Sequence, residues 1–261
     1  MNNILKRLYY NNDILKKYYK SFSLLKKNKL QHGGAFSIEY NNTKIKFNKI
    51  IDDGIIKLFI SSQNDENCIS ILIDKSKVAY IEGITNNKFN NCFDNPEFNK
   101  GFVIMEITIK MLKKYKHKLN IDTIQLKDNS FIYCSDKIKI WLSSLSFLQY
   151  NNTFYGRFGF IPKDKHLYKK YLQNQQILST TLLSNLNLNL IIELFSKKIK
   201  YEKEIISYYI KYQNKTIVYW FNKISHKYLL DNCSFFNHLI DYIFKEIKLD
   251  KFTHETFILN I

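Results

Sequence analysis

Apolar and polar residues alternate with a period of two through the first third of this chain, and this alternation constrains the fold more than any other feature. It is typical of half-buried β-strands, whose side chains point alternately to the two faces of a sheet. The expected strands lie at residues 36–40, 45–47, 55–60, 69–73 and 78–84. Asn41-Asn42, Asp52-Asp53-Gly54 and residues 74–77 separate them and have the composition of turns. The sequence therefore predicts an antiparallel meander.

A helical period replaces the strand period after a polar loop at residues 85–100. Apolar residues recur at intervals of three and four from Ile104 to Leu119, with lysines on the opposite face, which predicts a helix. The β-branched run at 103–109 leaves a strand as the alternative.

Two strands and a second helix complete the expected domain. The strands are predicted at 123–126 and 153–160, and the helix at about 137–149. The order is then strands, loop, helix, strand, helix and strand. It indicates a mixed α/β domain over residues 35–163, with a mainly antiparallel sheet flanked by helices.

The two ends of the chain differ from this domain in composition and in the spacing of their apolar residues. Residues 1–34 carry eight Lys or Arg against one Asp, with apolar residues at helical spacing, which predicts a basic amphipathic helical arm. Residues 164–261 are interpreted as a helix-rich C-terminal extension. Helices are expected there at 167–183 and 235–247, with a hairpin near Lys215.

The formal net charge of +17 indicates an affinity for anionic partners. Arg7 and Arg157 are the only arginines, however, and arginine supplies the bidentate contacts with which proteins read guanine. The composition therefore disfavours sequence-specific DNA recognition and leaves nonspecific attraction between lysine and phosphate. No run of 18 apolar residues occurs, so no membrane span is expected.

The four cysteines, Cys68, Cys92, Cys134 and Cys233, are far apart in the sequence and form no C-x-x-C pair. This usage is typical of a reducing compartment, so we expect buried free thiols, an intracellular protein and no structural metal. A nucleophilic Cys134 would need a partner histidine at a recognisable spacing, and none is present. A cysteine hydrolase is not expected.

The segment from Tyr155 to Phe160 reads Tyr-Gly-Arg-Phe-Gly-Phe, and it resembles the Y-x-x-x-G-F motif of the GNAT superfamily of acetyl-CoA-dependent N-acetyltransferases. The chain also resembles the GNAT-like proteins of large DNA viruses. This second likeness rests on the D-x-S segment at 128–130, on Cys134 and on a serine- and leucine-rich run at 142–148. The resemblance covers about residues 71–162. It implies a GNAT-like fold and, for a viral protein, a place in the host cytoplasm or in the virion.

The resemblance also implies that the loop before a helix holds the pyrophosphate of acetyl-CoA on backbone N–H groups, through the pattern R/Q-x-x-G-x-G/A. The corresponding segment here is Asn99-Lys100-Gly101-Phe102-Val103, which keeps one glycine. Lys100 can add a charge contact to phosphate, whereas Phe102 and Val103 crowd the loop. The alternative interpretation is that Gly101 only lets a helix begin close to a strand.

Aminolysis of a thioester needs an acid for the departing thiolate and a base for the amine. The resemblance implies that Tyr155 is the acid and that Glu82, on the strand before the cofactor loop, acts as the base through water. The alternatives are a core tyrosine and an exposed strand carboxylate. Asp128 and Ser130 are interpreted as caps of the turn after their strand.

Three functions are compatible with these features. The first is an acetyl-CoA-dependent N-acetyltransferase with a degenerate cofactor loop. The second is a catalytically inactive GNAT-like scaffold, a viral structural component that contacts viral or host proteins through the basic arm and the C-terminal helices. The third is a nonspecific nucleic-acid binder that uses lysines for backbone contact and its many tyrosines for stacking.

Overall fold

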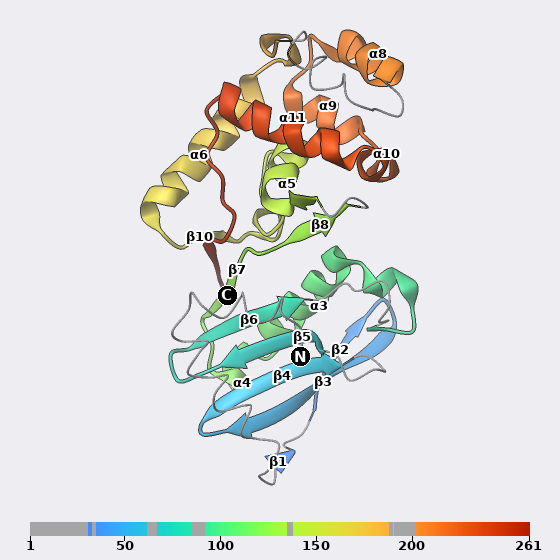
Figure 1. The fold of residues 1–261 in the computed structure, drawn as a ribbon. Helices are drawn as coiled ribbons and strands as arrows, with labels where there is room; N and C mark the ends of the chain where they lie inside the picture. The colour runs from blue at the N-terminus through green and yellow to red at the C-terminus, as the bar shows by residue number, and fades with distance from the viewer. Residues whose placement is uncertain are drawn as a thin grey trace. The chain divides into compact units, whose positions relative to one another are not determined.

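The computed structural model of the chain is a mixed α/β protein with mainly antiparallel strands and a helix-rich C-terminal region, as the sequence predicts (Figure 1). It describes residues 31–32, 35–61, 67–84, 92–134, 138–187, 190 and 202–261. The chain forms two compact units, Met1–Ile121 and Asp122–Ile261. The basic arm predicted at 1–34 lies outside the described residues except for Gln31–His32.

An antiparallel meander forms the sheet of the first unit. Its strands are β1 (Gln31–His32), β2 (Phe36–Tyr40), β3 (Thr43–Asp52), β4 (Ile55–Ser61), β5 (Asn67–Ile73) and β6 (Val78–Ile84). Each strand from β3 to β6 pairs with the next, and β1 and β2 both pair with β3. The five predicted strands and their antiparallel order are confirmed.

Residues that tolerate left-handed backbone conformations close the first hairpins. Asn41 and Asn42 have φ angles of 46° and 61°, a conformation that asparagine adopts more readily than most residues and that suits a tight hairpin turn. Asp53 and Gly54 repeat this geometry between β3 and β4, with φ angles of 44° and 75°. The turn composition thus sets where each strand ends.

A helix covers this sheet. The helical elements of the first unit are η2 (Pro96–Asn99), α3 (Gly101–Lys114) and α4 (Lys116–Leu119). The predicted helix is therefore confirmed, and the strand alternative for 103–109 is wrong. Tyr40 donates a hydrogen bond of 2.6 Å to the Glu106 carboxylate, and Tyr115 donates one of 2.7 Å to the Ser37 carbonyl oxygen, so α3 and the residue after it are tied to β2.

The last strand of the chain completes the sheet of the second unit. The strands are β7 (Thr123–Lys127), β10 (Ile161–Pro162) and β11 (Thr256–Asn260), and β11 pairs antiparallel with both of the others. The strand predicted at 123–126 is confirmed as β7, whereas β11 was not foreseen. The chain therefore leaves the sheet after β10, forms its C-terminal helices and returns to the same sheet.

A hairpin occupies the start of the helix predicted at 137–149. Its strands are β8 (Phe131–Tyr133) and β9 (Lys139–Trp141), and helix α5 (Leu142–Tyr150) begins directly after β9. Phe131 lies opposite Trp141 in the hairpin, with the two ring centroids 5.6 Å apart. Because this pairing uses residues 139–141 as a strand, the predicted helix start was too early.

The strand predicted at 153–160 is wrong. Residues 154 and 155 form a turn, and η3 (Gly156–Phe158) follows it. The Thr153 hydroxyl oxygen accepts the Gly156 N–H at 2.9 Å, and the Tyr155 carbonyl accepts the Phe158 N–H at 3.0 Å, so these backbone groups bond locally rather than across a sheet. Gly159 then takes a φ of 89°, and only Ile161–Pro162 pairs as a strand.

The C-terminal region contains the expected helices. Its described elements are α6 (Lys165–Thr180), η4 (Leu183–Asn185), α8 (Glu202–Tyr212), α9 (Ile217–Lys223), α10 (His226–Asp231) and α11 (Cys233–Glu246). The helices predicted at 167–183 and 235–247 are confirmed as α6 and α11. The hairpin predicted near Lys215 is wrong, because a turn joins α8 to α9 there and Thr216 caps α9.

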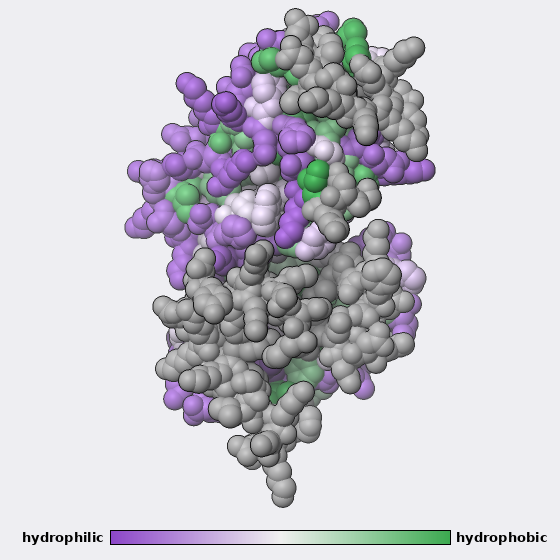
Figure 2. All heavy atoms as spheres, viewed as in Figure 1, coloured by the Kyte–Doolittle hydropathy of each residue, from purple (hydrophilic) through white to green (hydrophobic). Residues whose placement is uncertain are grey.

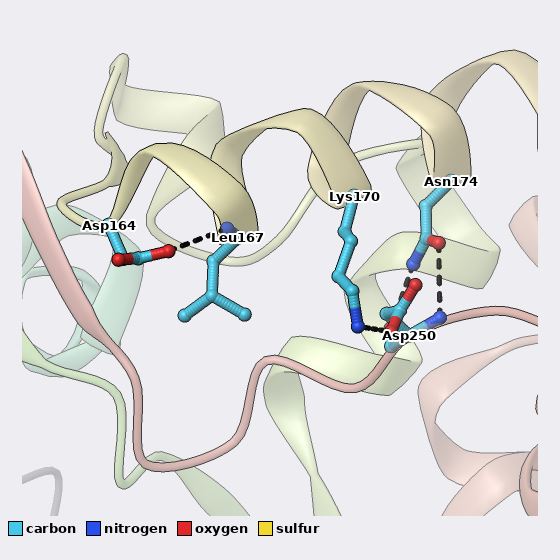
Figure 3. Close-up of polar contacts among 5 residues, drawn as sticks. All are labelled: Asp164, Leu167, Lys170, Asn174 and Asp250. Atoms are coloured by element: carbon cyan, nitrogen blue, oxygen red, sulfur yellow. Dashed lines mark hydrogen bonds and ion pairs between the residues drawn. The ribbon is translucent and has the colours of Figure 1, made fainter.

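Helix α6 is fixed to the segment that leads back to β11 (Figure 3). Asn174 is 1% exposed, and its side chain donates to the Asp250 carbonyl at 2.8 Å and accepts from the Asp250 N–H at 3.1 Å. Lys170 forms an ion pair of 2.7 Å with the Asp250 carboxylate, and Asp164 caps the start of the helix. One asparagine thus holds the returning chain by its backbone.

Candidate functional site

Asn99, the first residue of the predicted cofactor loop, is engaged in holding the loop itself. Its side-chain oxygen accepts the N–H groups of Cys92 at 2.9 Å and Phe93 at 3.0 Å, and its amide group donates to the Phe93 carbonyl at 2.8 Å. The neighbouring Lys100 pairs with Glu97, and both side chains are well exposed. Lys100 can therefore exchange that partner for a ligand, whereas Asn99 cannot do so without releasing the loop.

The start of α3 at Gly101 is compatible with an anion. Among the described residues no side chain caps this helix start, and the first turn carries no acidic residue. A Cβ atom added at Gly101 would meet nothing within 4 Å, so the space beside this residue is open. Phe102 and Val103 are half-buried. The expectation that they crowd the loop stays a prediction.

Glu82 lies at an irregularity in the β5–β6 pair. Ser70 is opposite Gly83 and Ile71 is opposite Ile81, which leaves Glu82 as an extra residue in β6. Such β-bulges re-aim a side chain and are frequent next to active sites. The Glu82 carboxylate accepts a hydrogen bond of 2.6 Å from the Ser70 hydroxyl. The carboxylate is thus held in place by a side chain of the neighbouring strand.

Tyr155 belongs to the second unit and lies among aromatic rings. Its ring centroid is 5.2 Å from that of Phe154, 6.3 Å from that of Phe160 and 6.4 Å from that of Phe257. Part of the residue remains exposed. Burial of the phenol and the nearby Asp128 carboxylate raise the pKa of Tyr155 above its ordinary value, while a hydrogen bond with Ser130 opposes the rise. The phenol therefore stays protonated at neutral pH.

Asp128 is a buried residue whose two carboxylate oxygens have different surroundings. It is 1% exposed, and its Oδ1 accepts the Ser130 N–H at 3.0 Å and the Ser130 hydroxyl at 2.5 Å, which confirms the predicted turn cap. Its Oδ2 has no hydrogen-bond partner among the described residues. Burial raises the pKa of Asp128 to about 6, against which the Ser130 hydrogen bonds act.

The segment before β11 fixes Asp128 through the main chain. The Asp128 N–H donates to the Glu255 carbonyl at 2.9 Å, and the His254 N–H donates to the Asp128 carbonyl at 2.7 Å. The imidazole of His254 contacts the Asn129 side chain at 2.6 Å, and its ring centroid lies 4.9 Å from that of Trp141. The position of the carboxylate therefore depends on the return of the chain to the sheet.

The prediction of free thiols is wrong for this structure. Cys68 pairs with Cys92 and Cys134 pairs with Cys233, with Cα–Cα distances of 5.7 Å and 5.8 Å, within the range of protein disulfides. Spacing in the sequence could not reveal pairs separated by 24 and 99 residues. No group of three or more metal-binding side chains occurs in the part of the chain that the structure describes.

We expect the purified protein, kept without reductant, to show no reactive thiol after unfolding, because all four cysteines are paired. Labelling with a maleimide and intact-mass measurement will count the thiols before and after reduction. Four labels should appear only after reduction, since each bond releases two thiols. Four labels without reduction would instead support the expectation of a reducing compartment.

Figure 2 shows mainly hydrophilic residues over α6 in this view, with hydrophobic residues in small, separate patches. In the described residues no helix has the length and apolar character needed to cross a membrane. Separate apolar side chains of this kind are ordinary for a solvated surface.

Comparisons of the chain with protein-family models, with curated proteins and with solved structures give no match. The chemistry of the site must therefore be inferred from its own residues. The sequence pointed to Tyr155 through the Y-x-x-x-G-F motif, but it presented Asp128 only as a turn cap. The signal that was available is the D-x-S segment followed by the strand at 131–133, which places the aspartate between two paired elements.

Proposed function

We propose that this protein is a GNAT-like N-acetyltransferase that transfers the acetyl group of acetyl-CoA to an amine. The mixed α/β fold, with a mainly antiparallel sheet and flanking helices, is compatible with this family. The observation that carries the proposal is the environment of Tyr155. Its phenol is buried and stays protonated, because burial and the Asp128 carboxylate raise its pKa against the effect of the Ser130 hydroxyl. A catalytic acid requires such a protonated, positioned group.

The start of α3 supports binding of the cofactor's pyrophosphate. The helix has a positive dipole end, and no side chain of the described residues caps it. Open space beside Gly101 and the exposed ammonium group of Lys100 suit an anion at this position. When bound, acetyl-CoA supplies the thioester that the amine attacks.

The protein's own residues would then move protons. Each unit holds one candidate for this chemistry. In the second unit, Tyr155 carries a phenol hydrogen of the kind that a departing sulfur needs, and in the first unit Glu82, held by Ser70, is a carboxylate of the kind that accepts a proton from an amine through water. The bulge that carries Glu82 supports a functional role for this carboxylate, since bulges re-aim side chains at active sites.

The test is calorimetric titration of the whole protein with acetyl-CoA and with CoA, followed by an assay of thiol release in the presence of polyamines and lysine peptides. We expect Tyr155→Phe to bind acetyl-CoA normally and to release thiol about 100-fold more slowly, because general acids contribute about that much or more. Tyr208→Phe is the matched control, since Tyr208 is 48% exposed and lies outside the site. Absence of binding at millimolar acetyl-CoA would contradict the proposal.

The engagement of Asn99 favours a second candidate function. Its amide oxygen accepts from the N–H groups of Cys92 and Phe93, its amide nitrogen donates to the Phe93 carbonyl, and the loop keeps one glycine of the family pattern. A GNAT-like scaffold without cofactor, acting as a virion or interaction component, fits this arrangement. It predicts no acetyl-CoA binding together with a stable complex with a viral or host protein, so the same titration separates the two candidates.

A further inference from the structure

Helices α8 and α9 present tyrosine rings and lysines together on one surface. The two helices are neighbours in the C-terminal region (Figure 1). The ring centroids of Tyr212 on α8 and Tyr219 on α9 are 5.5 Å apart, and Tyr219 is 40% exposed. Two rings and three lysines form this tyrosine–lysine surface, which consists of Tyr212, Tyr219, Lys211, Lys215 and Lys223. We propose that it binds single-stranded RNA.

The buried neighbours of the two tyrosines hold the helices together. Trp220, directly after Tyr219, is 1% exposed, and its ring centroid lies 6.5 Å from that of Tyr209 on α8. Tyr209 is itself buried, and its hydroxyl donates to the Leu186 carbonyl at 3.0 Å. The hydroxyls of Tyr212 and Tyr219, by contrast, have no hydrogen-bond partner among the described residues. The inward rings thus stabilise the helix pair, while the outward tyrosines are available to a ligand.

The turn between the helices fixes the spacing of the two outward rings. The Lys215 N–H donates to the Tyr212 carbonyl at 2.8 Å, and the Thr216 hydroxyl oxygen accepts the Tyr219 N–H at 3.2 Å. The Tyr212 ring is also supported from behind by Tyr208, which stacks on it with ring centroids 5.8 Å apart. The rings are therefore positioned before a ligand arrives, which lowers the entropic cost of binding.

The lysines give the surface a positive charge. Their ammonium nitrogens lie between 5.2 and 6.0 Å from the ring centroids of the two tyrosines, at 5.3, 5.9 and 5.3 Å. No carboxylate pairs with any of the three lysines in the part of the chain that the structure describes. Residues 206–230 contain four lysines and no Asp or Glu. A polyanion is therefore the partner of complementary charge.

Single-stranded RNA matches both the rings and the charge. Proteins commonly bind single strands by stacking bases on aromatic rings and holding the phosphates with basic side chains, and stacking tolerates any base because each has a π face. RNA is favoured over DNA by the tyrosine hydroxyls, because its 2′-hydroxyls both donate and accept hydrogen bonds. The core of a protein–protein interface is ordinarily depleted of lysine, which disfavours a protein partner here.

Fluorescence anisotropy of the whole protein with labelled strands tests the proposal. The strands are oligouridine, oligodeoxyuridine and an RNA duplex, each of about 12 nucleotides, within the usual size of such sites. We expect oligouridine to bind more tightly than the other two. Absence of oligouridine binding at low salt, or equal binding of all three strands, would overturn the proposal. The assay contains no acetyl-CoA, so its result does not depend on acetyl transfer.

Variants of Tyr219 separate stacking from hydrogen bonding. Tyr219→Ala should raise the Kd for oligouridine about tenfold, the loss expected when one base loses its stacking partner. Tyr219→Phe keeps the ring, so it should bind oligodeoxyuridine as the wild type does and show a smaller preference for RNA. The matched control is Tyr133→Ala on β8, since Tyr133 is 54% exposed and its ring also lies near a lysine. An equal loss in Tyr133→Ala and Tyr219→Ala would contradict the assignment to this surface.

The salt dependence of binding tests the three lysines. Replacing all three with glutamine should reduce the slope of log K against log salt concentration by about 2, because each phosphate contact on a single strand contributes about 0.7. The control changes the net charge equally at three exposed lysines elsewhere: Lys113, Lys165 and Lys169. Equal slopes in the two triple variants would mean that the overall charge alone attracts the strand, which would overturn the proposal.

Two further measurements complete the test. Circular dichroism will check that each variant folds, which we expect because the altered side chains lie on the surface. If oligouridine does not bind, while the wild type but not Tyr219→Ala captures another protein, the surface belongs to a protein partner and the proposal is wrong.

Discussion

Lowering the pH is expected to stabilise wild-type protein relative to an Asp128→Asn variant by about 3 kcal/mol across the window from pH 6 down to pH 3.8. The folded state raises the pKa of Asp128 from 3.8 to about 6, so the folded state binds the proton more tightly than the unfolded state does. An acid whose pKa is higher in the folded state than in the unfolded state stabilises the fold when it is protonated. This stabilisation is complete below the unfolded-state pKa and is lost as the pH rises through the folded-state pKa. Each pKa unit of difference between the two states corresponds to about 1.36 kcal/mol of free energy of unfolding.

Denaturant unfolding of wild type and Asp128→Asn, followed at several pH values between 3.5 and 7.5, will measure this difference. Taking the difference between the two proteins removes the titration of all other carboxylates. The effect of burying an amide remains in the difference as a constant that does not change with pH. A difference that does not depend on pH would show that Asp128 is ionised normally in the folded protein.

Replacing Asn174 by alanine is expected to lower the free energy of unfolding by about 3 kcal/mol, because both main-chain groups of Asp250 lose their partner. The side chain of Asn174 is buried and makes hydrogen bonds of 2.8 Å and 3.1 Å to these groups. Scanning calorimetry should record a melting temperature lower by roughly 10 °C for a unit of this size.

Gln173→Ala is the matched control for this effect, since Gln173 lies on the same helix and is exposed. Alanine favours helix formation in both variants by a few tenths of a kcal/mol, so that contribution cancels in the comparison. Equal melting temperatures for the two variants would mean that the segment before β11 is held by other contacts, such as the Lys170–Asp250 ion pair.

Periodicity was sufficient to predict the elements whose side chains alternate between core and solvent. The strands from Phe36 to Ile84 are examples, because a one-residue change of register would expose their buried faces. Helix α3 could be predicted for the same reason, as its apolar stripe is continuous. These elements could be predicted because the spacing of apolar residues in the sequence indicates which side chains face the core.

The strand predicted around Tyr155 is wrong because local hydrogen bonds turn the backbone there. The aromatic run at 154–160 has the composition of a strand, but Thr153 and Gly159 turn the backbone into a 3-10 helix. Likewise, β9 pairs with β8 across a short turn, and β11 pairs with two strands that are distant in sequence. Such pairings depend on tertiary contacts that a periodic pattern does not contain.

The candidate site also contains some residues that the sequence could identify and one whose environment it could not. Tyr155, Glu82 and the loop 99–103 were found through motif positions, and their roles stay predictions. The environment of Asp128 could not be foreseen, because the residues that bond to its main chain, His254 and Glu255, are distant in the sequence. A polar residue after a short strand is ordinarily a turn cap. Asp128 is such a cap, and its second carboxylate oxygen has no hydrogen-bond partner in the part of the chain that the structure describes.

The pairing of β10 with β11 gives the helical region a modular character. The chain departs after Lys163 and returns at Thr256, and these residues are joined by a hydrogen bond of 2.8 Å. Since exit and entry are adjacent, a short connection between them would preserve the order of β7, β11 and β10. The two strand pairs therefore set no limit on the length of the chain between them.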